Sequence, residues 1–357
     1  MSNTFGNLLR LTTSGESHGP EISCVLDGVP SGIPLSTADI QGDLNRRAPG
    51  QSKYTTPRKE PDLIEIRSGV YDGQTTGSSI SLAVQNTNTK SEDYDDIAQT
   101  FRPGHADATL YLKYGLRDPR GGGRSSYRTL VVAVAAGAIA KRMNPNTTYT
   151  AFVDQIGPIR ASIDGIPTQE EVEASPVRCP DLAASERMEQ LISEVATDGD
   201  SIGGALSFVI EGAGHSLGEP AFGKLSARLA HAMMSINATK GFEIGLGANV
   251  AELRGSQYND AILEVSQKNG VVTRTNNAGG ILGGISTGMP ITGRVQFHPT
   301  ASISIPQDTV DVHGDFQVII TEGRHDPCVL PRAVPAVEAM AALVVADLTL
   351  QNRISRI

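Results

Sequence analysis

Residues Arg117–Ser126 read Arg-Asp-Pro-Arg-Gly-Gly-Gly-Arg-Ser-Ser and lead into an Ala-rich segment, Val131–Met143, with the composition of a helix. Because Gly121–Gly123 lack a Cβ, their backbone can adopt positive φ and approach a bound group closely. Permanently charged guanidinium groups, which suit phosphate and carboxylate, surround them at Arg117, Arg120, Arg124 and Arg128. A glycine-rich loop before a helix N-terminus is typical of an anion site, although a surface turn with solvated arginines is the alternative for this motif alone. The spacing matches neither a Walker A loop nor a Gly-x-Gly-x-x-Gly fingerprint, so it does not indicate ATP or NAD.

Composition favours a small anionic ligand over a nucleic acid. The 357 residues could form one large domain or two ordinary ones, and they carry a net charge of −9 with only 4% aromatic residues. An acidic chain without stacking surfaces disfavours sequence-independent nucleic-acid binding. Two basic islands, residues 46–59 and 102–128, nevertheless stand out. Basic islands in an acidic protein suggest a small polyanion.

Cysteine usage and the N-terminus predict a cytoplasmic protein. Cys24, Cys179 and Cys328 are widely spaced without a Cys-x-x-Cys, which fits a reducing compartment and gives no support for a zinc or iron–sulfur site. The first residues show no charged stretch followed by an apolar run, so we recognise no signal peptide. We also expect no apolar run long enough to span a bilayer, and therefore no membrane partner.

Three short motifs carry candidate catalytic groups. His18 lies in Ser14-Gly-Glu-Ser-His-Gly19, and His105 lies in Phe101-Arg-Pro-Gly-His-Ala-Asp107. Loop histidines can transfer protons, but either one could equally be a surface or packing residue. Ser17 beside His18 also suggests a hydrolase, yet no Gly-x-Ser-x-Gly elbow is present. In Gly323-Arg-His-Asp-Pro-Cys328, Asp326 could orient a ligand or simply cap a helix within a salt bridge.

Two later segments combine glycines, amides and hydroxyls. Asn276–Gly288 and His298–Ser302 would suit a flat ring and a phosphate tail, and they would equally suit a bulged strand or a close-packed turn. Gly212–Gly218, with His215, has no basic residue close by and is given no function. Residues 154–200 are expected to be scaffold and subunit surface.

Periodicity predicts a mixture of strands and helices. Alternating apolar residues indicate strands at 8–13, 22–26, 63–66, 78–84, 149–156 and 205–210. Helical spacing indicates a helix capped by Ser36 that ends at Arg46–Arg47, an amphipathic segment through Tyr114, and helices at 131–143, 185–195, 225–236 and 334–350. The two arginines at the end of the first helix could serve only to stabilise its dipole. These patterns alone define no more than a mixed α and β chain.

Six motifs in order resemble the chorismate synthase family. They are Gly-Glu-Ser-His-Gly, Arg-Pro-Gly-His-Ala-Asp, Arg-Gly-Gly-Gly-Arg-Ser-Ser, Ser-Ile-Asn-Ala, Asn-x-Ala-Gly-Gly-Ile-Leu-Gly-Gly-Ile and Gly-Arg-His-Asp-Pro-Cys, and they run from the first residues to the last helix. The resemblance implies an α+β fold: a β-α-β sandwich with helices packed between antiparallel or mixed sheets, in a single domain over residues 1–357. The small side chains of Val131–Met143 fit a helix that is packed closely on both sides.

The resemblance also implies the activity. A carbon–oxygen lyase of this family eliminates phosphate and the C6 hydrogen of 5-enolpyruvylshikimate 3-phosphate in an anti-1,4 sense, giving chorismate at the last common step of the shikimate pathway. Reduced FMN is required without net redox change, because the flavin is thought to lend an electron and recover it. We expect a homotetramer in which NADPH enters only as a reductant, with reduced FMN supplied by a separate flavin reductase, because no appended reductase domain is recognisable.

Residue roles follow by resemblance. His18, His105 and Asp326 would be catalytic: His18 would protonate the departing phosphate, His105 would act near the flavin, and Asp326 would assist proton removal. The substrate anions would be bound by Arg47, Lys53, Arg102, Arg124 and Arg324. The flavin would contact Arg124, Ser125, Ser126, Asn237, Ala238, Gly283, His298, Pro299, Thr300, Ala301, Ser302 and Arg324.

The sequence departs from the family pattern at a few of these positions. Lys53 stands where the family usually has Arg, and so keeps the charge but loses the bidentate fork. His298 replaces a typical Lys and Ala301 a common Ser, both in the stretch expected to hold the flavin.

Two other classes of protein remain open. A flavin-dependent oxidoreductase would consume NADPH with turnover, and a non-catalytic anion-binding protein would bind substrate without releasing phosphate.

Overall fold

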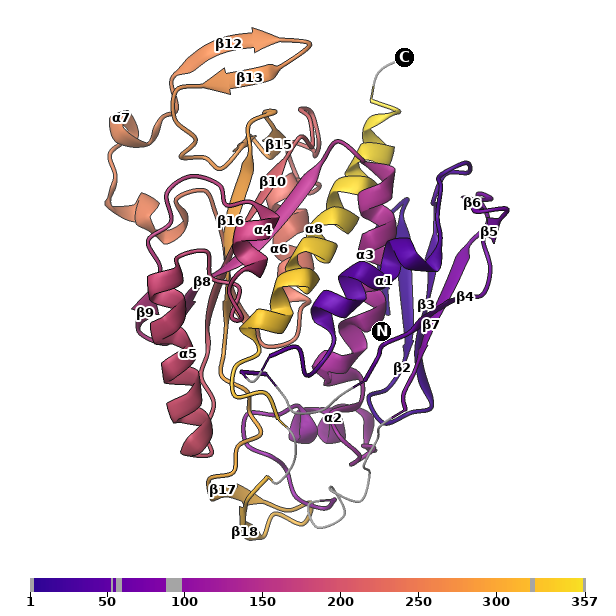
Figure 1. Ribbon diagram of the computed structural model, residues 1–357, viewed down its shortest axis with the longest axis vertical. Coiled ribbons are helices and arrows are strands. Elements are labelled where there is room, and N and C mark those ends of the chain that lie inside the picture. Colours follow the sequence, from indigo (N-terminus) through magenta and orange to yellow (C-terminus); the bar gives the residue numbers. More distant parts are fainter. Residues whose placement is uncertain (1–2, 53, 56–59, 88–97, 322–324, 356–357) are drawn as a thin grey trace.

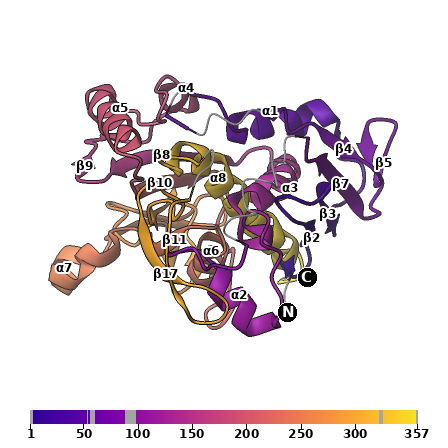
Figure 2. The same ribbon diagram turned by 90° about the horizontal axis from the view of Figure 1, so that it is seen from below.

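Two antiparallel sheets enclose a layer of helices in this computed structural model, which describes residues 3–52, 54–55, 60–87, 98–321 and 325–355. Figure 1 shows the layers from the side, and Figure 2 shows them from below, with the helices between the sheets. The predicted β-α-β sandwich is therefore confirmed. Within the described residues, the first five-stranded sheet has the order β1 (Thr4–Phe5), β2 (Arg10–Gly15), β3 (Glu21–Asp27), β7 (Ile80–Gln85) and β4 (Ile64–Ile66). The second has the order β11 (Thr239–Ile244), β16 (Ile291–Phe297), β10 (Gly204–Glu211), β8 (Thr148–Ile156) and β9 (Ile159–Arg160).

The central helices are α1 (Thr37–Arg47), α3 (Val131–Met143), α6 (Leu225–Met234) and α8 (Leu330–Asn352). Helix α1 begins as predicted at Ser36, whose backbone N–H and hydroxyl both donate to the Asp39 carboxylate. Helices α3 and α8 pack so closely that a Cβ built on Gly137 would lie 2.3 Å from the Cβ of Ala339. Glycine at this point is what lets the two helices touch, as the small-residue composition of the segment predicted.

Helix α8 overturns one expectation from the sequence. We expected no segment long and apolar enough to cross a bilayer, but α8 meets that criterion by length and composition. Its apolar residues have a different explanation here, because 89% of its most apolar window is buried inside the fold. A helix that is covered on all sides by protein is apolar all round without meeting lipid.

Smaller elements surround the sandwich. Three hairpins project from it: β5 (Val70–Tyr71) with β6 (Gln74–Thr75), β12 (Ile262–Ser266) with β13 (Gly270–Thr273), and β17 (Gln307–Val310) with β18 (Phe316–Ile319). The remaining elements are α2 (Asp107–Tyr114), α4 (Gln169–Glu173), α5 (Leu182–Thr197), α7 (Gly255–Tyr258), β14 (Ile281–Leu282) and β15 (Ile285–Ser286), with short 3-10 turns at 123–125, 127–130 and 247–252. Sequence patterns identified α5 but none of the three hairpins.

Candidate active site

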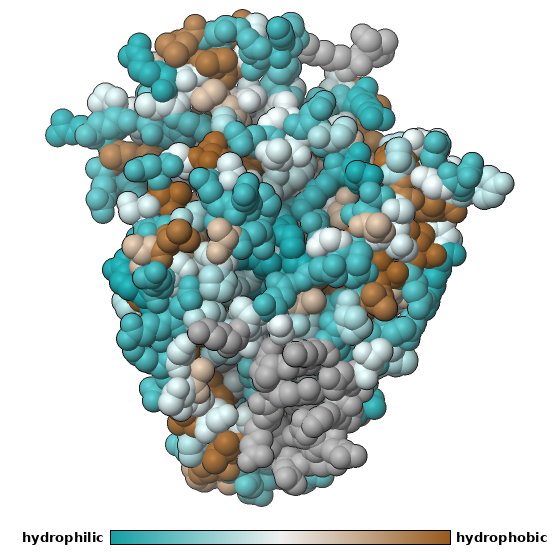
Figure 3. Space-filling view, in the orientation of Figure 1, coloured by the Kyte–Doolittle hydropathy of each residue, from teal (hydrophilic) through white to brown (hydrophobic). Residues whose placement is uncertain are grey.

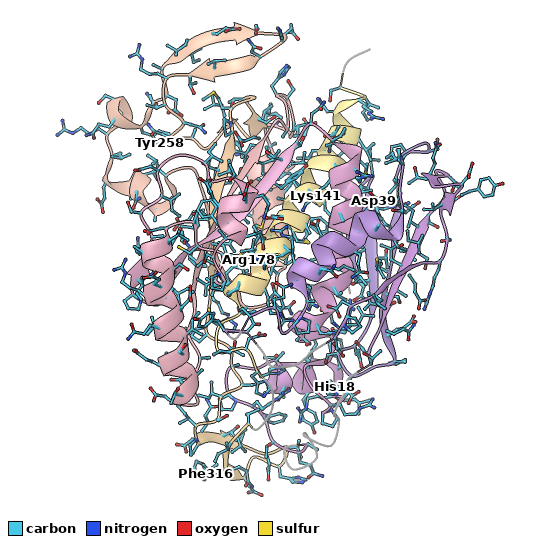
Figure 4. The ribbon with its side chains drawn as sticks, in the orientation of Figure 1. His18, Asp39, Lys141, Arg178, Tyr258 and Phe316 are labelled. Carbon is cyan, nitrogen blue, oxygen red and sulfur yellow. The ribbon has the colours of Figure 1, made fainter. Side chains whose placement is uncertain are left out.

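The candidate site lies where α3 and α8 begin, at the end of the sandwich that also holds α2 and the loop of His18 (Figure 4). Loops from both sheets converge there because β2 ends at Gly15, β7 ends at Gln85 and β16 ends at Phe297. Secondary structure thus brings together segments that lie far apart in the sequence.

The glycine-rich loop packs directly against the first histidine. A Cβ on Gly121, whose φ is +65°, would lie 2.6 Å from Cδ2 of His18 and 2.9 Å from Oγ of Ser17. The backbone N–H of Ser17 donates to the carbonyl of Gly123 over 3.3 Å. No other residue type would fit at position 121 without displacing the histidine, so the loop glycine sets the position of His18.

The second histidine belongs to a compact charged cluster. Asp107 accepts hydrogen bonds from Nε of Arg102 at 2.7 Å and from its Nη2 at 2.8 Å, and it lies 3.0 Å from Nδ1 of His105. Nη2 of Arg102 also donates to the carbonyl of Gly121 at 2.8 Å, which joins this cluster to the glycine-rich loop. Burial opposes the charge on Asp107, but hydrogen bonds from Arg102 and His105 hold its pKa far below the usual value.

A second cluster buries two arginines around Asp62, and Glu60 also pairs with one of them, Arg128, at 3.1 Å. Arg47 is 0% exposed and donates to Asp62 over 2.8 Å, and Arg128 donates to the other oxygen of the same carboxylate. Burial lowers the pKa of Arg47 to about 10, against the attraction of Asp62. Burial opposes the charge of Asp62 as well, yet the two arginines keep its pKa below the usual value. Arg47 and Asp62 are therefore both charged at neutral pH.

Several donors in these clusters are left over. Within the described part of the chain, Nε of Arg47, Nη2 of Arg128 and Oγ of Ser17 are buried without a hydrogen-bond partner. Nε of Arg128 binds Asn86, whose amide donates to the carbonyls of Glu16 and Gly19, so the arginine and the His18 loop are held together. Burying an unpaired donor costs about 1–3 kcal/mol, more for a charged group, which points to an anionic ligand that would pair with these donors.

Arg124, in the glycine-rich loop, also keeps its charge uncompensated. It donates to the carbonyl of Gly15 at 3.0 Å and to the hydroxyl of Thr13 at 2.7 Å, and among the described residues no carboxylate pairs with it. The neighbouring cavity of about 760 Å³ is lined by Gly121–Arg124, by Arg117 and by parts of β2 and β3. The volume of this cavity is in the range of sites that bind small molecules.

Most residues expected to contact the flavin gather beside this loop. The amide of Asn237 donates to the carbonyl of Ser125 at 2.7 Å, and the N–H of His298 donates to the carbonyl of Ala238 at 2.9 Å. Ala301 lies against Gly104, three residues from Asp107. A Cβ on Gly123 would meet nothing within 4 Å, so a ligand could approach this backbone closely. Arg124–Ser126, Asn237–Ala238 and residues 298–302 thus fit one binding region for a phosphate-bearing cofactor.

Gly283 is the exception. It sits in the β14–β15 turn, and the carbonyl of the next residue, Gly284, accepts from the N–H of Leu225 at the start of α6. Asn237 lies beyond the other end of α6. A ten-residue helix spans about 15 Å, so within one chain Gly283 is separated from the other candidates by that length.

Asp326 occupies the far side of the site. It pairs with Arg332, whose guanidinium lies 5.8 Å from the centre of the Tyr127 ring. The alternative from the sequence was a helix cap with a salt bridge: the salt bridge is present, but the N-cap of α8 is Val329, so Asp326 does not cap the helix. Tyr127 connects this pair to Arg47, which donates to the Tyr127 carbonyl at 3.2 Å. Lys53 and Arg324 lie outside the described residues.

Three functional candidates were missed as such from the sequence: Asp62, Asp107 and Arg332. Arg128 had been recognised as one of the guanidinium groups around Gly121–Gly123. Asp107 stood inside a motif that was singled out, and pairing each motif cation with an acid in reach would have identified it. Asp62 has no local signal, because its partners lie 15 and 66 residues away.

A fold of this kind, with buried guanidinium groups beside two histidines, defines a class of enzyme that handles a small, multiply charged anion. The family model described as "Chorismate synthase" matches residues 9–350. A chorismate synthase from Parabacteroides distasonis is 51% identical over 97% of both chains, and one from Rhodospirillum rubrum is 51% identical over 98% of this chain and 96% of its own. A solved structure titled "Crystal Structure of Chorismate Synthase" is 31% identical, with a TM-score of 0.75 over 97% of this chain and 93% of that one. The chain belongs to the chorismate synthase family.

Proposed function

We propose that this protein catalyses the anti-1,4-elimination of phosphate and the C6 hydrogen from 5-enolpyruvylshikimate 3-phosphate, yielding chorismate. The observation that carries this proposal is the set of buried, unpaired donors on Arg47, Arg128 and Ser17 beside His18. The substrate carries one phosphate and two carboxylates, and such groups satisfy guanidinium N–H donors with charge-assisted hydrogen bonds.

The described residues divide the work between binding and proton transfer. Arg47, Arg124 and Arg128 bind the substrate anions, while Arg102 orients the cluster around His105 and closes it onto the glycine-rich loop. His18, held against Gly121, protonates the departing phosphate. His105 acts near the flavin, and Asp326 assists proton removal. Lys53 and Arg324 are proposed as further anion contacts on the strength of the family resemblance.

Reduced FMN, when bound, supplies an electron that returns at the end of the reaction, so no net oxidation occurs. Arg124, Ser125, Ser126, Asn237, Ala238 and residues 298–302 would hold it, and the open backbone at Gly123 supports a phosphate contact there. His298 stands where a Lys is typical, and a Lys would place an ammonium group at this end of the site. We therefore expect His298→Lys to bind FMN more tightly, measured by flavin fluorescence titration.

We further propose a single-domain homotetramer in the cytoplasm that receives its reduced FMN from a separate reductase, with NADPH serving only as reductant. The separation of Gly283 from the other flavin candidates supports a site that a second subunit completes. Exposed apolar residues on the projecting hairpins, Ile262, Leu263 and Val265 on β12 and Phe316 and Val318 on β18, also support subunit contacts (Figure 3). Light scattering coupled to size-exclusion chromatography tests the tetramer.

The activity is tested by anaerobic incubation with dithionite-reduced FMN and the substrate, following phosphate release and chorismate absorbance together. Equal amounts of both products, with no NADPH consumed, support the proposal. Binding of substrate without either product at saturating reduced FMN would mean a non-catalytic binding protein. NADPH oxidation in proportion to turnover would mean a flavin-dependent oxidoreductase.

A further inference from the structure

Asp107 is a buried carboxylate to which the proposed reaction assigns no role. It is the first residue of α2 and is 2% exposed, yet it is surrounded by cationic groups rather than water. Burying a carboxylate is costly unless it is paired and hydrogen-bonded, so its position has to be explained by its partners. Those partners are Arg102, Arg117 and His105.

The turn before α2 places the imidazole against this carboxylate. The N–H of His105 donates to the carbonyl of Arg102 over 3.2 Å, and Gly104 supplies the positive φ of +69° that closes the turn. The backbone N–H of Arg102 donates to Oδ2 of Asp107 at 3.1 Å. The carboxylate therefore closes the turn on one side, while its Oδ1 lies 3.0 Å from Nδ1 of the ring.

The charges around the ring decide which nitrogen carries the proton. Nδ1 of His105 lies 3.0 Å from the Asp107 carboxylate and 3.3 Å from Nη2 of Arg102. An ionised carboxylate only accepts, so the shorter contact is favourable when Nδ1 carries hydrogen. Arg117 lies 3.1 Å from the same Oδ1, which makes Asp107 the anion facing the imidazole and Arg102 and Arg117 the cations grouped with it among the described residues.

We propose that Asp107 is a positioning residue for His105, accepting the proton of Nδ1 and thereby leaving Nε2 as the nitrogen that exchanges protons during the reaction. A histidine whose second nitrogen is held by a carboxylate keeps one tautomer and one orientation. Among the described residues, Asp107 is the carboxylate in contact with the ring, and without it Nδ1 would keep the contact with Nη2 of Arg102. The proposal rests on the proposed role of His105 in catalysis.

Helix stabilisation alone does not account for this geometry. Asp39 occupies the corresponding first turn of α1, where it caps the helix and pairs with Arg142 without contacting any histidine. Asp39 is therefore a matched control for the loss of a carboxylate in the first turn of a helix.

The test compares Asp107→Asn with Asp39→Asn by nitrogen NMR of the imidazole rings, using His105→Gln to assign the His105 signals. In the wild-type protein we expect the tautomer with hydrogen on Nδ1. In Asp107→Asn we expect a mixture of tautomers, because the carboxylate that accepts from Nδ1 is gone. Asp39→Asn should leave the tautomer of His105 unchanged. An unaltered tautomer in Asp107→Asn would overturn the proposal.

Turnover separates this proposal from the proposed reaction. In Asp107→Asn the kcat should fall by about 10–100-fold with the KM for the substrate nearly unchanged, and Asp107→Glu should restore part of the kcat. A changed tautomer with wild-type kcat would overturn the positioning role in catalysis by showing that His105 does not act in turnover. Should Asp107→Asn fail to fold, the wild-type spectrum decides alone, because hydrogen on Nε2 of His105 would overturn the proposal.

Discussion

Arg46 and Arg47 are neighbours at the end of the same helix, yet they enter two very different buried clusters. Arg46 joins Lys141, Asp43 and Glu338 between the helices, where Glu338 is 1% exposed and accepts from both cations. Arg47 joins Asp62 and Arg128 at the candidate site. Within the described residues, every buried side-chain polar atom of the Arg46 cluster has a hydrogen-bond partner. In the Arg47 cluster, Nε of Arg47 and Nη2 of Arg128 have none.

This difference separates charged groups that stabilise the fold from charged groups whose donors are available to a ligand. The Arg46 cluster ties α1 to α3 and α8, and the carboxylate of Glu338 even reaches the N–H of Ala151 in β8. A fully paired cluster gains nothing from a further anion. The Arg47 cluster keeps donors without partners, which costs stability and is recovered when an anion binds. Unsatisfied donors, rather than the number of arginines, therefore mark the site.

The largest effect is expected in the fully paired cluster. Glu338→Gln breaks two buried ion pairs at once, while Arg46 keeps Glu173 and Lys141 keeps Asp43. We expect the free energy of unfolding to fall by about 3–5 kcal/mol. Urea denaturation measures this change. At temperatures where the variant is folded, its kcat/KM should match the wild type, and a loss of activity without a loss of stability would contradict the separation of the two clusters.

Acid should weaken the same cluster in a defined pH window. Burial opposes the charge on Glu338, but Lys141 and Arg46 lower its pKa from 4.5 to about 2. A lowered pKa in the folded state means that the stabilisation is present above pH 4.5 and is lost as the pH falls toward 2, by about 3 kcal/mol in total. Denaturation series at several pH values should show a steeper loss in this window for the wild type than for Glu338→Gln.

Replacing Arg47 should lower activity and should cost less stability than replacing Glu338. Arg47→Met removes an unsatisfied donor, but it also removes a buried partner of Asp62 and of the Tyr127 carbonyl. Because Asp62 keeps its partner Arg128, we expect the free energy of unfolding to fall by about 1–3 kcal/mol. The kcat/KM should fall by about 10–100-fold, as expected when a charge-assisted hydrogen bond to the substrate is lost. A variant with wild-type kcat/KM would show that the Arg47 cluster is structural too.

The smallest effect is expected for a surface ion pair. Arg10 at the start of β2 and Asp27 at the end of β3 pair at the surface of the first sheet, with side chains 55% and 44% exposed. Asp27→Asn should change the free energy of unfolding by about 0.5 kcal/mol or less, because solvent and salt screen such pairs. Thermal unfolding at low and high salt checks this, and a change comparable to that of Glu338→Gln would show that burial is not what distinguishes the clusters.

Local patterns predicted local structure well. The cap of α1 at Ser36 and the small-residue face of α3 follow from short-range rules, and both are confirmed. The sandwich arrangement came from the resemblance to a family, since periodicity does not say which strands pair. Nothing near Asp62 in the sequence reveals that its buried carboxylate joins two arginines from different helical segments. The β12–β13 and β17–β18 hairpins were missed because exposed apolar residues interrupt the alternation that marks a half-buried strand.

Calorimetric titration of 5-enolpyruvylshikimate 3-phosphate into the wild-type protein, Arg46→Met and Arg47→Met, without reduced flavin so that no turnover occurs, tests the central claim most directly. The two variants lose the same charge from adjacent positions of one helix. We expect Arg46→Met to bind with wild-type affinity despite its lower stability, and Arg47→Met to bind about 10–100-fold more weakly. Equal affinity for Arg47→Met and the wild type, or equal weakening in both variants, would contradict the claim that the unpaired donors mark the substrate site.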